Sequence, residues 1–338
     1  MILIMKSLLI NIGLLLSSLI ILFLGIEFLL RVTGLQSAKP NPPKIFMQSE
    51  FPDISYELIP NLKNEPAYKG HVSTNSLGFR GPEINTKNRT IAIFGDSIAF
   101  GYGVNDNETL DHYMRELIPE RNVLNTAAPG YNLEMETAVY RERVKKLNPE
   151  VIAIVFYFND LTGTIGILDD KGILRSSDWD PSQKDCRPIE TGLLGYLPGK
   201  CWLDGHSAFY KAFKKAIDLR SSKQRKIEEQ ITSESKPEED DVTNEQLADY
   251  SAQLDTFVSL MRENQKRIFV IWPDQFLHEP SRPKIKSLAE ERGFEVIDLY
   301  ETFSNKVPTL PWDTVHPSPE ALKRAAKSIV EVTINHET

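Results

Sequence analysis

Cysteine is scarce in this sequence, and positive charge is in deficit. Only two of the 338 residues are cysteines, Cys186 and Cys201, and neither has the C-x-x-C spacing or the neighbouring histidines of a zinc or redox site. Lysine and arginine total 39 against 47 aspartates and glutamates, which gives a formal net charge of −8. Because nucleic-acid binding depends on basic surfaces that neutralise phosphates, this balance argues against a nucleic-acid partner.

The two cysteines lie close together in a segment rich in glycine and proline. We expect Cys186 and Cys201 to form a disulfide that clips this segment, with two unconnected buried thiols as the alternative. A disulfide indicates an oxidising compartment, so we expect the main domain to lie outside the cytoplasm.

One long hydrophobic run stands near the start of the chain. From Ser7 to Ile26 the residues SLLINIGLLLSSLIILFLGI are apolar except for Asn11 and scattered serines, and a helix of this length spans ~30 Å, the thickness of a bilayer's hydrocarbon core. We therefore expect a single-pass membrane anchor. A cleaved signal peptide is the alternative, but its apolar region is shorter, and 36–38 is a poor cleavage site. The flanking basic residues do not decide the orientation.

Beyond the anchor, composition divides the chain into a linker and one large domain. With 41% hydrophobic and 25% charged residues, the chain can bury one large core. The predicted parts are a short tail (1–6), the anchor (7–28), a linker and lead-in (29–89), and the main domain (90–335) with insertions at 165–205 and 220–246. The first insertion follows a strand, where α/β sheets bind ligands, so we expect it to shape a pocket or lid. The second is too polar to fold alone.

Short apolar runs alternate with helical patterns throughout the main domain. Runs that are apolar at nearly every position are typical of strands buried on both faces of a sheet. We predict strands near 90–94, 122–127, 150–158, 267–272 and 294–299. Helices are predicted near 108–118, 132–147, 244–265 and 281–292, with a last one from Ser318 to Val332. The alternation predicts an α/β domain with a parallel sheet between two layers of helices.

A serine stands at the end of the first of these strands, in FGDSIAFGYGV. A serine hydroxyl becomes nucleophilic when a histidine accepts its proton and a carboxylate orients that histidine. Among the six histidines, His316 lies in the loop WDTVHPSPEAL before the last helix, with Asp313 three residues earlier. We therefore predict Ser97 as nucleophile, His316 as base and Asp313 as the residue that orients it.

Two further strand ends carry groups that stabilise an oxyanion. Backbone N–H groups at glycine turns and asparagine amides are common donors to the negative oxygen of a tetrahedral intermediate. Gly130 follows the second strand in NTAAPGYN, and Asn159 follows the third in FYFNDL. Because the carboxyl ends of parallel strands share one edge, these groups and Ser97 are expected to converge.

These blocks together resemble the SGNH (GDSL-type) hydrolase superfamily. FGDS matches its first block, APGYN its second, YFND its third and DTVH its last, in the same order from Ile91 to about Val332. The resemblance implies a three-layer α/β/α sandwich of flavodoxin-like type. It also implies an oxyanion hole made by the Ser97 and Gly130 N–H groups and the Asn159 amide. Tyr157 departs from the pattern, since the third block usually has glycine there.

Five other residues are candidates for substrate contact: Asp96, Tyr157, Asp160, Trp179 and Trp202. For Asp96 and Asp160 the alternative is a role in local turns, because short acidic side chains accept hydrogen bonds from nearby N–H groups. For Trp179 and Trp202 the alternative to stacking on sugars is partial burial in the core. Glu27 and Arg31, one helical turn apart, are predicted only to pair at the membrane edge.

The sequence therefore predicts a membrane-tethered serine esterase that needs no metal or organic cofactor. The segment TNSLGFRGPE, residues 74–83, resembles the lead-in of membrane-anchored members that act on cell-envelope material. We expect the substrate to be an acylated carbohydrate, with O-acetyl or other acyl groups on an envelope polysaccharide. The alternatives are an O-acyltransferase that uses the same site and an inactive carbohydrate-binding or assembly module.

Overall fold

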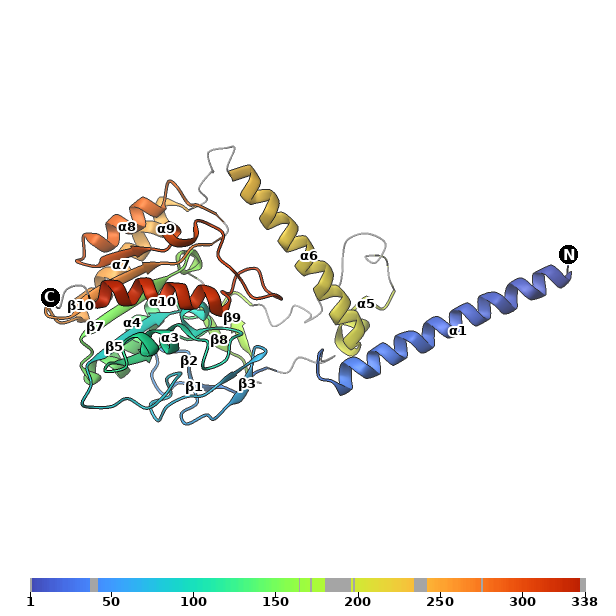
Figure 1. Ribbon diagram of the computed structural model, residues 1–338, viewed down its shortest axis with the longest axis horizontal. Coiled ribbons are helices and arrows are strands. Elements are labelled where there is room, and N and C mark those ends of the chain that lie inside the picture. The colour runs from blue at the N-terminus through green and yellow to red at the C-terminus, as the bar shows by residue number, and fades with distance from the viewer. Residues whose placement is uncertain are drawn as a thin grey trace. The chain divides into compact units, whose positions relative to one another are not determined.

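The computed structural model describes residues 2–36, 42–163, 165–170, 172–179, 196, 198–233, 242–274 and 276–334 (Figure 1). These residues form two compact units. We call the first the anchor unit, which comprises Met1–Asn41 and Asp180–Lys223, and the second the sheet unit, which comprises Pro42–Trp179 and Gln224–Thr338.

A five-stranded parallel sheet is the centre of the sheet unit. Its strands lie in the order β11-β10-β7-β5-β6, and every neighbouring pair is parallel. The bounds are Thr90–Gly95 for β5, Asn122–Asn125 for β6, Val151–Phe156 for β7, Lys266–Ile271 for β10 and Glu295–Asp298 for β11. All residues of β5, β6 and β7 are buried, as expected for strands covered on both faces.

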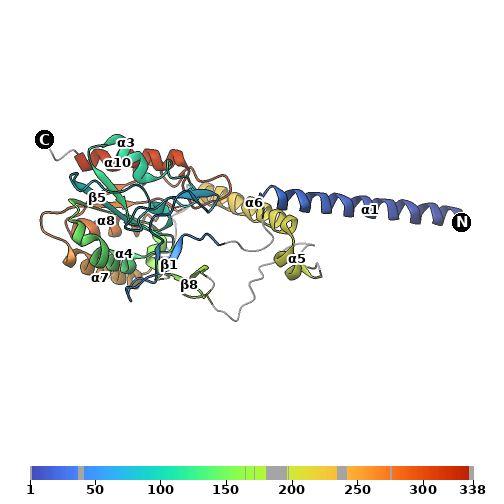
Figure 2. The same cartoon turned by 90° about the horizontal axis from the view of Figure 1, so that it is seen from below.

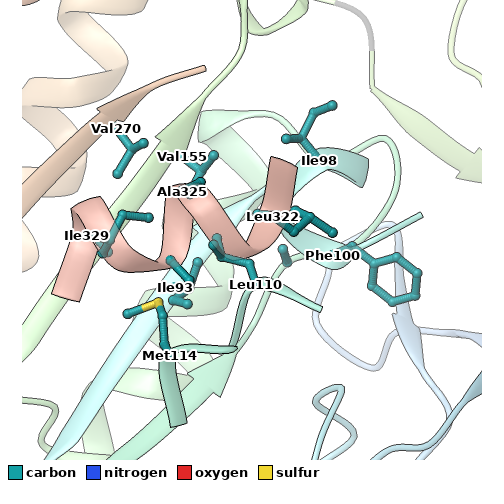
Figure 3. Packing of buried hydrophobic residues seen from close by; sticks show 14 of the residues in the cluster. Ile93, Ile98, Phe100, Leu110, Met114, Val155, Val270, Leu322, Ala325 and Ile329 are labelled. Carbon is teal, nitrogen blue, oxygen red and sulfur yellow. The ribbon is translucent and has the colours of Figure 1, made fainter. Parts of the chain in front are cut away.

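Helices cover both faces of this sheet. Successive residues of a strand point to opposite faces, so Ile91 and Ile93 enter one core while Ala92 and Phe94 enter the other. Over the first face lie α3 (Leu110–Leu117) and α10 (Pro319–Ile334), and Figure 3 shows Ile329 and other α10 side chains above the strands. Over the second lie α4 (Leu133–Val139), α7 (Asn244–Leu260) and α8 (Arg282–Glu290). The predicted three-layer α/β/α sandwich is confirmed.

Several shorter elements connect the layers. They are α2 (Ser97–Phe100), η1 (Tyr140–Val144), η2 (Lys145–Leu147), η3 (Phe158–Thr162), the hairpin β8 (Gly166–Leu168) and β9 (Leu174–Ser176), and α9 (Tyr300–Phe303). The helix predicted over 132–147 is thus one α-helix continued by a π-turn and a 3₁₀ turn. The first predicted insertion begins with the β8–β9 hairpin, a small antiparallel sheet.

The lead-in is an integral part of the sheet unit. It forms two short antiparallel ladders, β1 (Phe46–Gln48) with β2 (Tyr56–Leu58) and β3 (Glu65–Ala67) with β4 (Gly70–Val72). Ile54, Tyr56 and Val72 are each at most 2% exposed and pack into the two cores. Residues 42–89, predicted as linker and lead-in, therefore help to build the domain.

The anchor unit contains α1 (Ile2–Val32), α5 (Lys200–His206) and the start of α6 (Ala208–Ser233). From Ile10 to Val32, α1 is long and apolar enough to cross a membrane. α6 continues into the polar insertion predicted from 220, whose lysines, arginines and glutamates are good helix formers. Cys201 is disulfide-bonded, whereas Cys186 lies outside the described residues, so the pairing stays a prediction.

Candidate active site

The turn after β5 presents Ser97 at the edge of the sheet. Gly95 has φ +150°, and a Cβ there would lie 2.7 Å from the Cβ of Ala99 and 3.1 Å from the Val155 carbonyl oxygen. Only glycine fits so close an approach. Asp96 then caps α2 by accepting a hydrogen bond from the Ile98 N–H at 2.8 Å. The strand, the glycine and the cap together place Ser97 at the first helical position.

His316 and Asp313 meet Ser97 in an ordered chain. His316 Nε2 lies 3.0 Å from Ser97 Oγ, and His316 Nδ1 lies 2.8 Å from Asp313 Oδ2. Asp313 Oδ1 accepts hydrogen bonds from the N–H groups of Val315 and His316. Partial burial alone would raise the pKa of Asp313, but the hydrogen bonds and charge of His316 hold that pKa well below its usual range. An ionised Asp313 therefore favours the proton on Nδ1, which leaves Nε2 to accept the Ser97 proton.

Two tyrosines that the sequence analysis did not single out support the histidine. The Tyr102 ring stacks on the His316 imidazole, with centroids 3.9 Å apart and planes 19° apart. Tyr68, from the lead-in, stacks in turn on Tyr102 at 4.1 Å. The stack restricts rotation of the imidazole. No local pattern reveals it, because the three residues come from separate segments of the chain.

The predicted oxyanion donors lie at three neighbouring strand ends. Among the described residues, neither the Ser97 N–H nor the Gly130 N–H donates to a protein acceptor. Gly130 has φ +85°, and a Cβ there would lie 3.1 Å from the Tyr56 hydroxyl oxygen. The exposed Asn159 donates one amide N–H to Asp96 Oδ2 at 2.9 Å, which leaves its second N–H to point elsewhere.

Arg80 fastens the lead-in to the loop that follows the serine. Its side chain is 1% exposed, and its guanidinium donates to the carbonyl oxygens of Phe100, Gly101 and Val104 at 2.7–3.0 Å. It also pairs with Asp106 at 3.2 Å. One residue thereby satisfies several carbonyls of the loop that carries Tyr102. Arg80 lies in the segment TNSLGFRGPE, and the sequence alone did not indicate this role for it.

Three buried carboxylic acids lie behind the serine. Asp96 is 2% exposed, Glu136 2% and Asp160 7%. Burial raises the pKa of all three, that of Glu136 to about 8, and the neighbouring acids add to the rise for Glu136 and Asp160. Asp160 accepts the Tyr157 N–H at 3.1 Å within a capping box. Both Asp96 and Asp160 are buried and accept hydrogen bonds from cap N–H groups, as the alternative of a role in local turns predicts.

The other candidates for substrate contact are placed differently. Tyr157 is half-buried and lines a cavity of 130 Å³, together with Thr314 and Val315 from the His316 loop. The Trp179 ring packs under the Arg175 guanidinium, whose carbon lies 4.4 Å from the centroid of the ring. Trp202 belongs to the anchor unit and is 63% exposed. Of these residues, only Tyr157 shares a cavity with the loop of the histidine.

Two other features of the sheet unit lie apart from this constellation. A larger cavity of 750 Å³ is lined by Pro52, Glu134, Asp249 and their neighbours, and by none of the serine, histidine or aspartate described above. Among the residues that the structure describes, no group of histidine, cysteine and carboxylate side chains could hold a metal ion.

Comparison with known proteins identifies the family. The family described as GDSL-like lipase/acylhydrolase matches residues 91–329, more than half of the chain. A search of the curated proteins finds no match. Similar solved structures include a lipolytic G-D-S-L protein from Desulfitobacterium hafniense, with 13% identity, 72% of this chain and 99% of that chain covered, and a TM-score of 0.43.

Two further similar structures are esterases. One is a catalytic mutant of an acetylxylan esterase from Geobacillus stearothermophilus, with 15% identity, 72% and 93% of the two chains covered, and a TM-score of 0.38. The other is a psychrotrophic esterase from Pseudoalteromonas, with 10% identity, 72% and 96% covered, and a TM-score of 0.40. On the match to the family over residues 91–329, this chain belongs to the GDSL-like lipase/acylhydrolases of the SGNH superfamily.

Proposed function

We propose that this protein is a membrane-tethered serine esterase that removes short acyl groups from cell-envelope polysaccharide. The observation that carries the proposal is the continuous chain Ser97–His316–Asp313, with contacts of 3.0 and 2.8 Å. A serine and a histidine at this distance are within reach for proton transfer. The family supports ester chemistry, since its members are described as lipases and acylhydrolases.

The reaction begins with attack by Ser97 Oγ on the ester carbonyl carbon. His316 Nε2 takes the serine proton and passes it to the leaving sugar oxygen, so the C–O bond of the ester breaks and an acyl-enzyme remains. Water then gives a proton to His316 and attacks the acyl carbon. The bond from the acyl carbon to Ser97 Oγ breaks, the acid leaves, and His316 returns the proton to Ser97 Oγ. Asp313 keeps the imidazole oriented and stabilises its positive charge in both steps.

The negative charge of each tetrahedral intermediate develops on the former carbonyl oxygen. The unpartnered N–H groups of Ser97 and Gly130 and the second N–H of Asn159 are the donors we assign to it. Asp96 acts through Asn159, because its hydrogen bond fixes the plane of that amide.

The size of the cavity beside the histidine loop supports a short acyl group. The cavity measures 130 Å³ and is lined by Tyr157 and by Thr314 and Val315, which directly precede His316; a space this small suits an acetyl group better than a long fatty chain. A membrane anchor on the same chain keeps the sheet unit near a membrane, which raises its effective concentration toward envelope polymers. We assign the sheet unit to the extracytoplasmic side, because the expected disulfide between Cys186 and Cys201 requires an oxidising compartment.

A series of nitrophenyl esters tests the acyl specificity. We expect kcat/KM to fall steeply from acetyl to octanoyl, because the longer chain does not fit the cavity lined by Tyr157 and Val315. Replacing Val315 by alanine should improve the longer ester relative to the acetyl ester, while Leu117→Ala, at an exposed site on α3, should leave the ratio unchanged. A preference for octanoyl over acetyl in the native enzyme would refute the short-acyl assignment.

Partition between water and a sugar acceptor tests hydrolysis against transfer. The enzyme would be given an acyl donor with increasing oligosaccharide, and free acid and acylated sugar would be measured by mass spectrometry. We expect free acid to dominate, because Asn159 is exposed and the site is open to water. Acylated sugar as the main product would make the protein an O-acyltransferase.

A further inference from the structure

Hydrogen bonds join the start of α6 to the C-terminal end of α1. The Glu27 carboxylate accepts hydrogen bonds from Ser207 Oγ at 2.9 Å and from the N–H groups of Ala208 and Phe209 at 2.9 and 2.8 Å. The first N–H groups of a helix lack partners within the helix, so Glu27 supplies both the acceptors and the negative charge that this helix end favours. Arg31 pairs with Glu27 at 2.6 Å and so completes the junction.

This junction gives α5 and the start of α6 a defined place beside α1 (Figures 1 and 2). Arg31 also donates to the carbonyl oxygen of His206, the last residue of α5. On the apolar side, the ring of Phe209 packs edge-to-face against Phe23 of α1 at 5.0 Å. We call residues 200–217 the α5–α6 corner.

An apolar groove of 720 Å³ runs between α1 and the α5–α6 corner. Its apolar wall comprises Phe23, Leu24, Trp202, Leu203, Phe209 and Phe213. Trp202 is 63% exposed, Leu24 62% and Phe213 43%. Exposed aromatic and aliphatic side chains gathered on one surface mark a site that something apolar covers.

The membrane itself is the occupant that fits this groove. Phe23 and Leu24 belong to both the groove wall and the apolar stretch of α1 that could cross a bilayer, so the groove opens onto the surface that would face acyl chains. They lie within about one helical turn of Glu27, the first charged residue after the apolar run of α1, and such a charge marks the approach to the membrane interface. Tryptophan is enriched at this depth, where its ring contacts acyl chains and its N–H contacts water.

The charge of the corner favours an anionic headgroup. Residues 200–217 contain four lysines, at 200, 211, 214 and 215, and a single acidic residue, Asp204. Asp204 pairs with Lys214 at 3.4 Å, and Asp218 directly follows the corner, so residues 200–218 hold two more lysines than aspartates. Lysines beside a membrane attract anionic lipids electrostatically.

We propose that the α5–α6 corner is a lipid-binding surface that lies in the membrane interface and holds an anionic phospholipid. One acyl chain occupies the groove beside Phe23 and Trp202, and the headgroup lies among the lysines of the corner. The inference rests on the proposed membrane tether, because the groove reaches lipid only when α1 is inserted.

Fluorescence quenching in bilayers tests the contact. The full chain is reconstituted in phosphatidylcholine with phosphatidylglycerol, with and without bromine on the acyl chains, and the emission of Trp202 is taken as native protein minus Trp202→Phe. We expect Trp202 to lose about half of its emission, with bromines near the headgroup more effective than bromines near the chain end, since interfacial segments lie ~5–10 Å deep. Trp272→Phe is the matched control, because Trp272 is fully buried in the sheet unit and should show no quenching.

Extraction with alkaline carbonate separates the two claims. If carbonate releases the protein from the bilayer, the proposed tether fails, whatever Trp202 does. If the protein resists carbonate but Trp202 is no more quenched than Trp272, the tether stands and the lipid-binding surface is refuted.

A lysine variant tests the headgroup. The double variant Lys211→Gln/Lys215→Gln should remove the additional quenching of Trp202 that phosphatidylglycerol gives over phosphatidylcholine alone. The control Lys323→Gln/Lys327→Gln changes the same charge on α10 of the sheet unit and should keep it. Equal quenching by neutral and anionic lipid in the native protein would overturn the anionic preference.

Discussion

The edge of the sheet and the α5–α6 corner differ in which side chains they bury. The edge buries polar groups, whereas the corner exposes apolar ones. At the edge, polar groups lie close to the core, and the protein supplies their partners, as Arg80 does for the carbonyls of three residues. At the corner, apolar side chains such as Trp202 remain largely exposed. Most polar groups of the first region have partners within the protein, apart from those assigned to the oxyanion, whereas we propose that lipid covers the apolar side chains of the second.

The largest effect tests whether the polar edge is the reactive surface. Ser97→Ala should abolish labelling by a fluorophosphonate and lower kcat by about 10⁴-fold or more, because a triad without its nucleophile retains only the contributions of binding and the oxyanion hole. Activity-based labelling and ester hydrolysis measure this. The control Ser76→Ala removes an exposed serine that bonds to Glu83 and should change neither. Undiminished labelling of Ser97→Ala would place the nucleophile elsewhere.

The next effect tests whether the edge depends on partners supplied by the lead-in. Arg80→Ala should lower the free energy of unfolding by about 3 kcal/mol, since it leaves buried carbonyls without a donor and opens a cavity. Chemical denaturation measures the loss. Arg89→Ala, which removes a 65% exposed side chain paired with Glu150, should cost less than ~1 kcal/mol. Similar losses in both variants would contradict the special role of Arg80.

The pH dependence of stability tests the buried acids behind the serine. Burial raises the pKa of Glu136 to about 8 in the folded protein, against about 4.3 for an unfolded chain. Between these values the folded state keeps a proton that the unfolded state has released, so stability is full at low pH and falls as pH rises toward 8, by at most ~1.4 kcal/mol per pH unit for one proton.

Glu136→Gln should therefore flatten the loss of stability between pH 5 and pH 8, as measured by denaturation at both values. Some slope should remain, because burial also raises the pKa of Asp160. Glu134→Gln, on an exposed position of the same helix, should retain the native slope. An unchanged slope in Glu136→Gln would show that this carboxyl does not carry the proton.

The smallest effect concerns the ring stack under the histidine. Tyr102→Leu should lower kcat about tenfold with little change in KM, because the imidazole gains freedom to leave the orientation that faces Ser97. Tyr102→Phe keeps the ring and should stay within about twofold of the native kcat. If the leucine and phenylalanine variants are equally active, the stack does not position His316.

The sheet could be predicted because its signal is local. The runs around Ile93 and Ile154 are apolar at consecutive positions, and only strands buried on both faces require this. Ser97 follows the first of these strands, Asn159 follows the second, and the turn with Gly130 follows β6 between them in the chain. Since parallel strands end at one edge, chain order alone brought these groups together.

The remaining parts depend on contacts between distant segments. Tyr68 reaches Tyr102, and Tyr56 bonds to the Pro129 carbonyl, only after the lead-in packs against the sheet. Glu27 and Arg31 were correctly expected to pair, since both lie one turn apart on a helix. The partner of Glu27 at the start of α6 lies 180 residues away along the chain, and no periodicity could indicate it.

The long separation between Ser97 and His316 has a consequence during biosynthesis. The two residues are 219 positions apart, which at ~5–20 residues per second means that a ribosome makes the serine about 10 to 45 s before the histidine. Throughout that interval the nascent chain holds an alcohol with no base beside it. On the proposed mechanism, the unfinished chain therefore lacks an activated nucleophile, and ester hydrolysis starts only after the last helix, which follows His316, has docked.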